Sequence, residues 1–225
     1  MTLWLTRIVP DLHSREARRD LRGASAAMGI HRRLMSLYPD HAESDPRARF
    51  GVLFRVEDTS DGQHILLQSS HEPDLTRLPD GYGTALTRPL DPLLEALRSG
   101  LTVRYRCTAS PVRKPGDTTR ARYNLPAAIP LAGEDADEWW TRQADNAGLK
   151  PLSNHSHALE AARAVRTPNS ASEKQHIRHN RVRFDGTATI INPELLRQKI
   201  NEGIGRGKAY GCGLLSIAPA RNTIL

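Results

Sequence analysis

The part of the sequence that most constrains the fold lies near its C-terminal end, where signals for a helix, a glycine-rich loop and a strand follow one another. Asn192 is a favourable N-cap and Pro193 a favourable first helical residue, and apolar residues recur at helical spacing, so the sequence predicts a helix over 193–202. Five of the next eleven residues, 203–213, are glycines. The apolar run 214–218 then predicts a strand. This segment is therefore expected to form a helix–loop–strand unit.

The glycine-rich loop, residues 203–213, has the properties of an anion-binding segment. Glycines leave main-chain N–H groups open to a bulky polyanion, and Arg206 and Lys208 add positive charge. The loop is not a P-loop, because Glu202 occupies the first glycine position, and it is not a dinucleotide loop, because it runs from helix into strand. A flexible connection remains the alternative. We predict that the loop binds nucleic-acid phosphates through Gly205, Arg206, Gly207 and Lys208.

The charge and composition of the chain indicate what kind of molecule it is expected to bind. The chain of 225 residues carries a formal net charge of +7 with a pI near 9.8, and such a balance favours a polyanionic partner. A solvated basic surface remains the alternative. Aromatic residues make up 5% of the chain, so stacking on single-stranded bases is not expected to dominate binding.

Cysteine spacing and hydropathy indicate the cellular compartment in which the protein is expected to act. Cys107 and Cys212 have neither metal-site nor disulfide-framework spacing. No apolar run approaches the length of a membrane span, and residues 1–10 predict a strand rather than a signal peptide. We expect a cytoplasmic protein that does not contact a membrane.

The first half of the chain predicts the order β-α-β-β. A strand is expected over 3–9 and a helical region over 14–38, which glycines divide into two pieces. Two strands are expected over 51–57 and 64–68, and a short helical connector over 89–97.

The second half repeats this plan. The pattern predicts strands at 101–109, 155–165, 175–184 and 187–191, a helix at 133–147, and the helix–loop–strand unit. Two tandem β-α-β-β-α-β units, an α+β fold, fit this order, although the first unit lacks a strong second helix. The expected domains are residues 1–88, with a connector at 89–100, and residues 101–225.

His31 is the strongest candidate for acid–base chemistry. It lies at the edge of the apolar stripe formed by Ile30, Leu34 and Leu37, beside Arg32 and Arg33. Histidine is a natural general acid–base near neutral pH, and adjacent guanidinium groups can stabilise charge on a phosphate. A boundary histidine without a catalytic role is the alternative.

A second basic cluster surrounds the hairpin between the two long predicted strands. The predicted RNA-binding members of this cluster are Arg163, Arg166, Lys174 and Arg178, near which Arg181 and Arg183 also lie. A solvated surface is again the alternative. Four histidines lie in the same region, but no cysteine or carboxylate cluster accompanies them, so no metal site and no cofactor are expected.

Taken together, these features resemble the CasE family, the CRISPR RNA-processing endoribonucleases of type I-E Cascade. The resemblance covers nearly the whole chain, and its most specific marker is the segment 203–219. The other markers are the segments 3–7, 17–21, 31–34, 67–69, 72–74 and 104–111.

This resemblance implies two tandem ferredoxin-like (RRM-like) domains and metal-independent cleavage of a CRISPR repeat RNA hairpin. The implied products carry a 2′,3′-cyclic phosphate and a 5′-hydroxyl, and the protein stays on the crRNA 3′ hairpin beside other Cascade subunits. His31 matches the family's catalytic histidine. Met28 and Ser36 stand where some members carry tyrosine and lysine, so Arg32 and Arg33 are the predicted substitutes. Two alternatives remain: a non-catalytic RNA-hairpin-binding subunit and a ribosome-like basic RNA binder.

Overall fold

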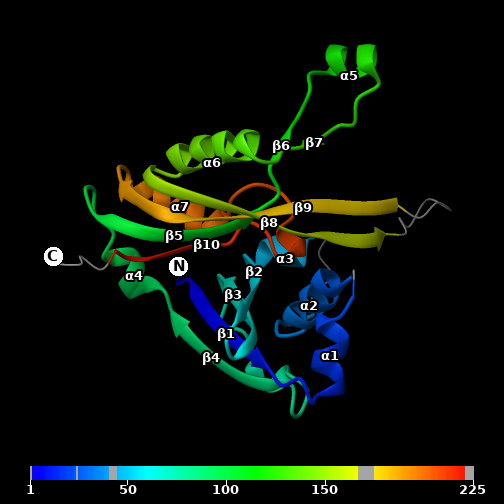
Figure 1. Ribbon diagram of the computed structural model, residues 1–225. Helices are drawn as coiled ribbons and strands as arrows, with labels where there is room; N and C mark the ends of the chain where they lie inside the picture. Colours follow the sequence, from blue (N-terminus) through cyan, green and yellow to red (C-terminus); the bar gives the residue numbers. More distant parts are fainter. Residues whose placement is uncertain (1, 24, 41–44, 167–174, 221–225) are drawn as a thin grey trace.

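The computed structural model describes residues 2–23, 25–40, 45–166 and 175–220, and it contains two four-stranded antiparallel sheets (Figure 1). The strand orders are β2-β3-β1-β4 and β10-β5-β9-β8. In each sheet the first and third strands of the unit lie in the centre, which is the arrangement of a ferredoxin-like domain. The predicted α+β fold with two tandem ferredoxin-like domains is therefore confirmed. The exact domain boundaries at residues 88 and 101 stay a prediction.

The first sheet has helices on one face. Its strands are β1 (Trp4–Pro10), β2 (Leu53–Thr59), β3 (Gly62–Ser69) and β4 (Gly83–Pro89), and its helices are α1 (Arg15–Leu21), α2 (Ala26–Met35) and the short α3 (Pro46–Arg49). The core side chains Ile8, Leu34, Phe54, Ile65 and Leu67 pack between α2 and the sheet. This packing fixes which face of α2 is buried and where His31 lies.

The strand β4 was missed by the sequence analysis, which expected three strands in this half. Most of its residues are exposed, so it lacks the apolar alternation from which a strand is predicted. Its register against β1 nonetheless runs from Trp4 opposite Pro89 to Pro10 opposite Gly83. The 3-10 turn η1 (Leu75–Arg77) occupies the place of the missing second helix.

The second sheet is longer and carries a projecting hairpin. Its strands are β5 (Thr102–Ala109), β8 (Leu149–Arg166), β9 (Gln175–Ile190) and β10 (Leu215–Pro219), and its helices are α6 (Glu134–Asn146) and α7 (Pro193–Glu202). Trp140 stacks on Phe184 with ring centroids 4.9 Å apart, so the tryptophans of the acidic segment belong to the core. The strands β8 and β9 extend beyond the sheet body as a two-stranded ribbon (Figure 1).

The remaining elements are connections. They are α4 (Asp91–Glu95) between the domains, β6 (Val112–Arg113), α5 (Asp117–Tyr123) and β7 (Ile129–Pro130), and the 3-10 turn η2 (Lys208–Tyr210). Figure 1 shows α5 standing out from the body at the end of β6 and β7. None of the helices in the described ranges has the length and apolar character needed to cross a bilayer.

The helix–loop–strand unit forms as the sequence predicts. The side chain of Asn192 accepts hydrogen bonds from the N–H groups of Glu194 and Leu195, and α7 ends at Gly203 with φ of 75°. A Cβ at Gly203 would lie 2.8 Å from the side chain of Leu53 in the first domain. The glycine is therefore needed both to end the helix and to let the two domains approach.

Candidate active site

His31 lies on α2, a helix of the first domain that also packs against β8 and η2 of the second domain. Its ring is half-buried and stacks against Phe54, with centroids 6.3 Å apart and an interplanar angle of 21°. Its Nδ1 is buried and has no hydrogen-bond partner among the described residues. Burial lowers the pKa of His31, the positive charge of Arg47 lowers it further, and Asp45 acts in the opposite direction. The imidazole is therefore neutral near pH 7, as a general base must be.

Arg47 is a candidate that the sequence analysis missed. It lies on α3, a helix of four residues whose N-cap, Asp45, accepts a hydrogen bond from the N–H of Ala48 at 3.0 Å. Its guanidinium approaches the carbonyl of Val52 at 3.4 Å and the carboxylate of Asp45 at 3.9 Å. No periodic pattern marks so short a helix, so only the folded chain brings this cation beside His31.

The glycine-rich loop meets Arg47 across the domain boundary. Arg47 and loop residues 205–210 line a hollow of about 380 Å³, and η2 packs against α2 and β2. Lys208 donates from Nζ to the carbonyl of Glu202 at 2.6 Å, and burial and the charge of Arg47 lower its pKa. Three cations, Arg47, Arg206 and Lys208, thus face one hollow that both domains build. Such a surface suits a phosphate group.

Close packing explains why glycines occur at the predicted loop positions. A Cβ at Gly205 would lie 3.3 Å from the ring of Trp139. Gly207 has φ of 80°, and a Cβ there would lie 3.3 Å from Nδ1 of His179. Side chains at these positions would push the loop away from α6 and β9, on which it packs.

His179 lines this hollow and is one of the four histidines in the basic hairpin region for which the sequence predicted no metal site. It is 5% exposed, and its ring lies 4.7 Å from that of Tyr210. Its Nδ1 is buried without a hydrogen-bond partner in the described ranges. Burial lowers its pKa, and Arg206 lowers it further. Its only sequence signal is its place on the basic hairpin.

The predicted helpers Arg32 and Arg33 are engaged elsewhere. Nε of Arg33 lies 2.8 Å from Oδ2 of Asp20, and its guanidinium covers the ring of Tyr82 at 5.2 Å. Nε of Arg32 approaches the carbonyl of Met28 at 3.4 Å. Both line a different hollow of about 490 Å³. A catalytic role for either residue stays a prediction, and Arg47 is the cation whose charge acts on His31.

The basic hairpin places the predicted RNA-binding arginines at the surface. Arg163 and Arg178 are exposed cross-strand partners on β8 and β9. Nε of Arg178 donates to Oδ1 of Asn180 at 3.0 Å. Lys174 and the side chain of Arg166 lie outside the described residues. Like charges that face each other across a ladder favour an external anion between them.

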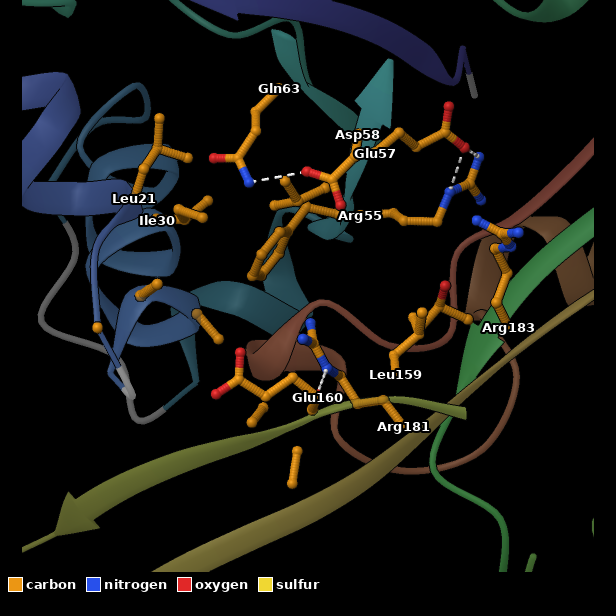
Figure 2. A pocket seen from close by; sticks show the side chains of 18 residues that line it. Leu21, Ile30, Arg55, Glu57, Asp58, Gln63, Leu159, Glu160, Arg181 and Arg183 are labelled. Carbon is orange, nitrogen blue, oxygen red and sulfur yellow. Dashed lines mark hydrogen bonds and ion pairs between the residues drawn. The ribbon is translucent and has the colours of Figure 1, made fainter. Parts of the chain in front are cut away.

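A cavity of about 390 Å³ lies between the two domains (Figure 2), and Phe54 is one of its lining residues. Ile30 and Leu21 reach it from the helices of the first domain, and Leu159 and Glu160 from β8. Both predicted functional regions, the helix of His31 and the basic hairpin, therefore contribute to its wall.

The two cysteines are buried and unpaired. Cys107 on β5 lies opposite Leu215 of the neighbouring strand β10, so the first and last strands of the second domain are adjacent, as in a ferredoxin-like fold. Burial raises the pKa of each thiol to about 12. Within the described ranges, no three His, Cys, Asp or Glu side chains gather where they could hold a metal ion.

The fold and the site define a protein of two tandem ferredoxin-like domains that meet at a cationic glycine-rich loop. The chain belongs to the family described as CRISPR associated protein, whose model matches residues 3–219, and within it to the Cse3 and CasE group.

Three comparisons illustrate this membership. The chain is 29% identical over 226 residues to the CRISPR-associated endoribonuclease Cse3 of Thermus thermophilus, which covers 96% of this chain and 100% of the relative. The structure of Thermus thermophilus Cse3 bound to an RNA representing a pre-cleavage complex matches with a TM-score of 0.75 and 26% identity, over 97% of this chain and 100% of the other. A chain of a CRISPR RNA-guided surveillance complex in a pre-nicking state is 38% identical with a TM-score of 0.66, over 96% and 100% of the two chains.

Proposed function

We propose that this protein is an endoribonuclease that cleaves CRISPR repeat RNA at a hairpin. The observation that carries the proposal is the neutral, half-buried His31, whose pKa is lowered by Arg47, a residue that itself lines a hollow with two further cations, Arg206 and Lys208. A general base next to a phosphate-binding surface is what RNA cleavage by an internal hydroxyl requires. The similarity to relatives named as CRISPR endoribonucleases supports this choice.

In the proposed reaction the nucleophile belongs to the substrate. His31 removes the proton of the 2′-hydroxyl beside the scissile phosphate, and the 2′-oxygen forms a bond to phosphorus. The bond to the 5′-oxygen breaks, and that oxygen takes up a proton from water. The hydroxide that remains removes the proton from the His31 imidazolium and restores the neutral base. The products carry a 2′,3′-cyclic phosphate and a 5′-hydroxyl, and no metal-activated water is needed. Arg47 and Lys208 stabilise the negative charge that grows on the phosphate oxygens.

Binding of the hairpin is assigned to the second domain. Duplex RNA is recognised largely through its phosphates, 2′-hydroxyls and shape. Cations for such contacts come from Arg163 and Arg178 on the β8–β9 hairpin of the protein and from Arg206 and Lys208 in the glycine-rich loop. The product stays bound to this surface, and the protein acts in the cytoplasm as a subunit of Cascade. The match to a chain of a surveillance complex supports the assembly.

A non-catalytic hairpin-binding subunit is the second candidate. The observation in its favour is the helix around His31, which carries Met28 and Ser36 where some family members carry tyrosine and lysine. The hydroxyl of Ser36 donates to the carbonyl of Arg33 at 2.7 Å, so it is occupied within the helix.

One experiment separates these candidates. The purified protein is incubated with its cognate repeat RNA in a chelator, and the product ends are identified by mass spectrometry. We expect one cut that leaves a cyclic phosphate, and no cut when the nucleotide that supplies the nucleophile is 2′-deoxy. A protein that binds the hairpin and never cuts it would be the binding subunit, and a cut that needs added metal would overturn the proposed mechanism.

A further inference from the structure

The cavity shown in Figure 2 is lined by two residues that adjoin the proposed catalytic histidine. Ile30, the residue before His31, lies in its wall. Phe54 also borders the cavity, and its ring stacks on His31. His31 is thus one aromatic ring away from a hollow of about 390 Å³, which is in the size range of small-ligand sites.

The charges around this cavity balance, unlike those of the hollow at the glycine-rich loop. Three guanidinium groups and three carboxylates line it, namely Arg55, Arg181, Arg183, Glu57, Asp58 and Glu160. Several are satisfied internally: Nε of Arg181 donates to the carbonyl of Glu160 at 2.8 Å, and Nε of Arg183 lies 2.7 Å from the carboxylate of Asp185. A phosphate would meet carboxylates here, so the cavity disfavours an anion. It suits a neutral group with both donors and acceptors.

The remaining wall is apolar and includes a flat ring. Leu21, Ile30 and Phe54 come from the first domain, and Leu159 comes from β8. On the polar side, the amide of Gln63 donates to Oδ1 of Asp58 at 2.9 Å, which presents an amide and a carboxylate together (Figure 2). A nucleobase has the matching chemistry, because its faces are apolar and its edge carries donors and acceptors.

The cavity lies next to the cationic hollow, which is the one lined by Arg47 and loop residues 205–210. One cross-strand pair of the β8–β9 ladder contributes a residue to each of them. Ala162 of β8 lines the cavity, and its cross-strand partner His179 of β9 lines the hollow. A nucleotide joins a neutral base to an anionic phosphate through one ribose. Together the two hollows offer separate environments for these two parts, with His31 near both.

From this placement we propose that the cavity receives a single unpaired nucleobase that flanks the scissile phosphate of the RNA. The proposal rests on the proposed function and adds a binding site to it. Anchoring this base fixes the ribose beside the phosphate and holds the 2′-hydroxyl in line for attack. The cavity therefore contributes to the rate of cleavage more than to the affinity for the hairpin.

Filling the cavity from opposite walls tests this site. Ala27→Leu adds volume from α2, and Ala161→Leu adds it from β8. Ala96→Leu makes the same change at an exposed position outside the cavity and is the control. We expect each filled variant to cut on the order of a hundredfold more slowly in single-turnover assays, because misplacement of the reacting groups has an effect of that size. Affinity for the isolated hairpin should stay unchanged, as should both quantities in the control.

Changes in the RNA provide an independent measurement. An abasic nucleotide is placed on either side of the cut in turn, and at one of these positions it should slow the wild type as much as filling the cavity does. That RNA should show no further loss with the filled variants. Wild-type rates for both filled variants, or for both abasic RNAs, would overturn the proposal.

A binding readout keeps the proposal testable if a variant fails to fold or if no RNA is cut. An uncleavable 2′-deoxy repeat carries 2-aminopurine at the flanking position, and its fluorescence should change when wild-type protein binds. Unchanged fluorescence at both flanking positions in a fully bound complex would overturn the base site. Absence of cleavage by the wild type together with a fluorescence change would overturn the proposed enzyme and retain the base site.

Discussion

The guanidinium of Arg55 donates a hydrogen bond to the main-chain carbonyl of Leu214 across the domain boundary, at 3.2 Å. Leu214 directly follows the glycine-rich loop, and Arg55 directly follows Phe54, the residue on which His31 stacks. Arg55 is 3% exposed and also reaches the hydroxyl of Ser216 at 3.1 Å and the carboxylate of Glu57 at 2.7 Å. This one side chain therefore fixes the loop relative to the proposed base.

Replacing Arg55 should reduce both stability and cleavage. Arg55→Met leaves Glu57 with Arg106 as its remaining partner and removes a donor from two carbonyls, so we expect the free energy of unfolding in urea to fall by about 2–3 kcal/mol. Cleavage by the protein that remains folded should also slow. Arg104→Met, an exposed change on the adjacent β5, should alter neither quantity. Full stability and full activity in Arg55→Met would show that the domains are held together by other contacts.

The pH dependence of cleavage should depend on Arg47. If His31 is the general base, the rate rises with pH through the pKa of His31 and then levels off. Because that pKa is lowered, the midpoint of the rise should lie below the ordinary histidine value of 6.5. Removing the positive charge in Arg47→Gln should raise the pKa and move the acidic limb of the profile to higher pH.

Arg32→Gln offers a direct comparison with Arg47→Gln. Arg32 precedes Arg33 on α2 and lines a different hollow, so the acidic limb should stay in place in this variant. A limb that moves in Arg32→Gln and not in Arg47→Gln would favour the assignment made from the sequence.

His31→Ala itself should lose cleavage by about a hundred- to ten-thousand-fold with little change in hairpin affinity.

How far the sequence predicted this site depended on whether the signal was local. Helix α7, its cap Asn192 and its end at Gly203 follow from neighbouring residues, and so does the placement of His31 at the edge of an apolar stripe. The ion pair of Arg33 could not be predicted locally, because its partner, Asp20, lies thirteen residues earlier on another helix. Sequence adjacency to His31 is a poor guide on a helix, since consecutive side chains point in different directions.

The residues that sequence reasoning missed are brought in by tertiary structure. Arg47 reaches the site through a four-residue helix. His179 reaches it because the glycine-rich loop packs against β9, where Gly207 lies close to the ring of His179. The strand β4 pairs along its whole length with β1 although its own side chains are mostly exposed. In each case the determining contacts join segments distant in sequence, which local periodicity does not encode.

Folding stability should fall in mild acid because the half-buried His31 and the buried His179 are neutral in the folded protein. The pKa values of His31 and His179 are lowered, so the unfolded chain binds more protons below pH 6.5. The contribution of the two neutral histidines to the free energy of unfolding is therefore fully present above about pH 6.5. It decreases as the pH falls toward the folded-state pKa values, by at most about 1.4 kcal/mol per pH unit for each histidine. Urea unfolding between pH 8 and pH 5.5 measures this slope.

Substituting His179 provides the matched variant for this pH measurement. His179→Phe removes one of the two groups and should flatten the slope, whereas His13→Asn at an exposed position should leave it as in the wild type. An equal slope in His179→Phe and wild type would mean that His179 is already protonated in the fold or is not buried in solution.

The glycine-rich loop should contribute to RNA affinity through charge. Arg206→Gln and Lys208→Gln each remove one cation, so the slope of log affinity against log salt should decrease by about one unit for each phosphate that the variant no longer binds. Glutamine keeps an N–H donor near the end of the side chain in place of the ammonium group of Lys208, which donates to the carbonyl of Glu202 in the wild type. Lys150→Gln, at an exposed position near the start of β8, is the control and should keep the wild-type slope. Unchanged affinity and slope in both loop variants would remove the loop from the RNA-binding surface.

The two thiols should be dispensable for cleavage and slow to react. Cys107 and Cys212 are fully buried, and their raised pKa of about 12 leaves almost no thiolate at neutral pH. We expect the double variant Cys107→Ala, Cys212→Ala to cut RNA at the wild-type rate, with a modest loss of stability from the missing sulfur atoms. A colorimetric thiol reagent should label the native protein far more slowly than the urea-unfolded chain. Rapid labelling of the native fold would mean that at least one thiol is accessible. A stably folded double variant that no longer cuts would mean that a thiol acts in the reaction, since burial alone would then fail to describe these residues.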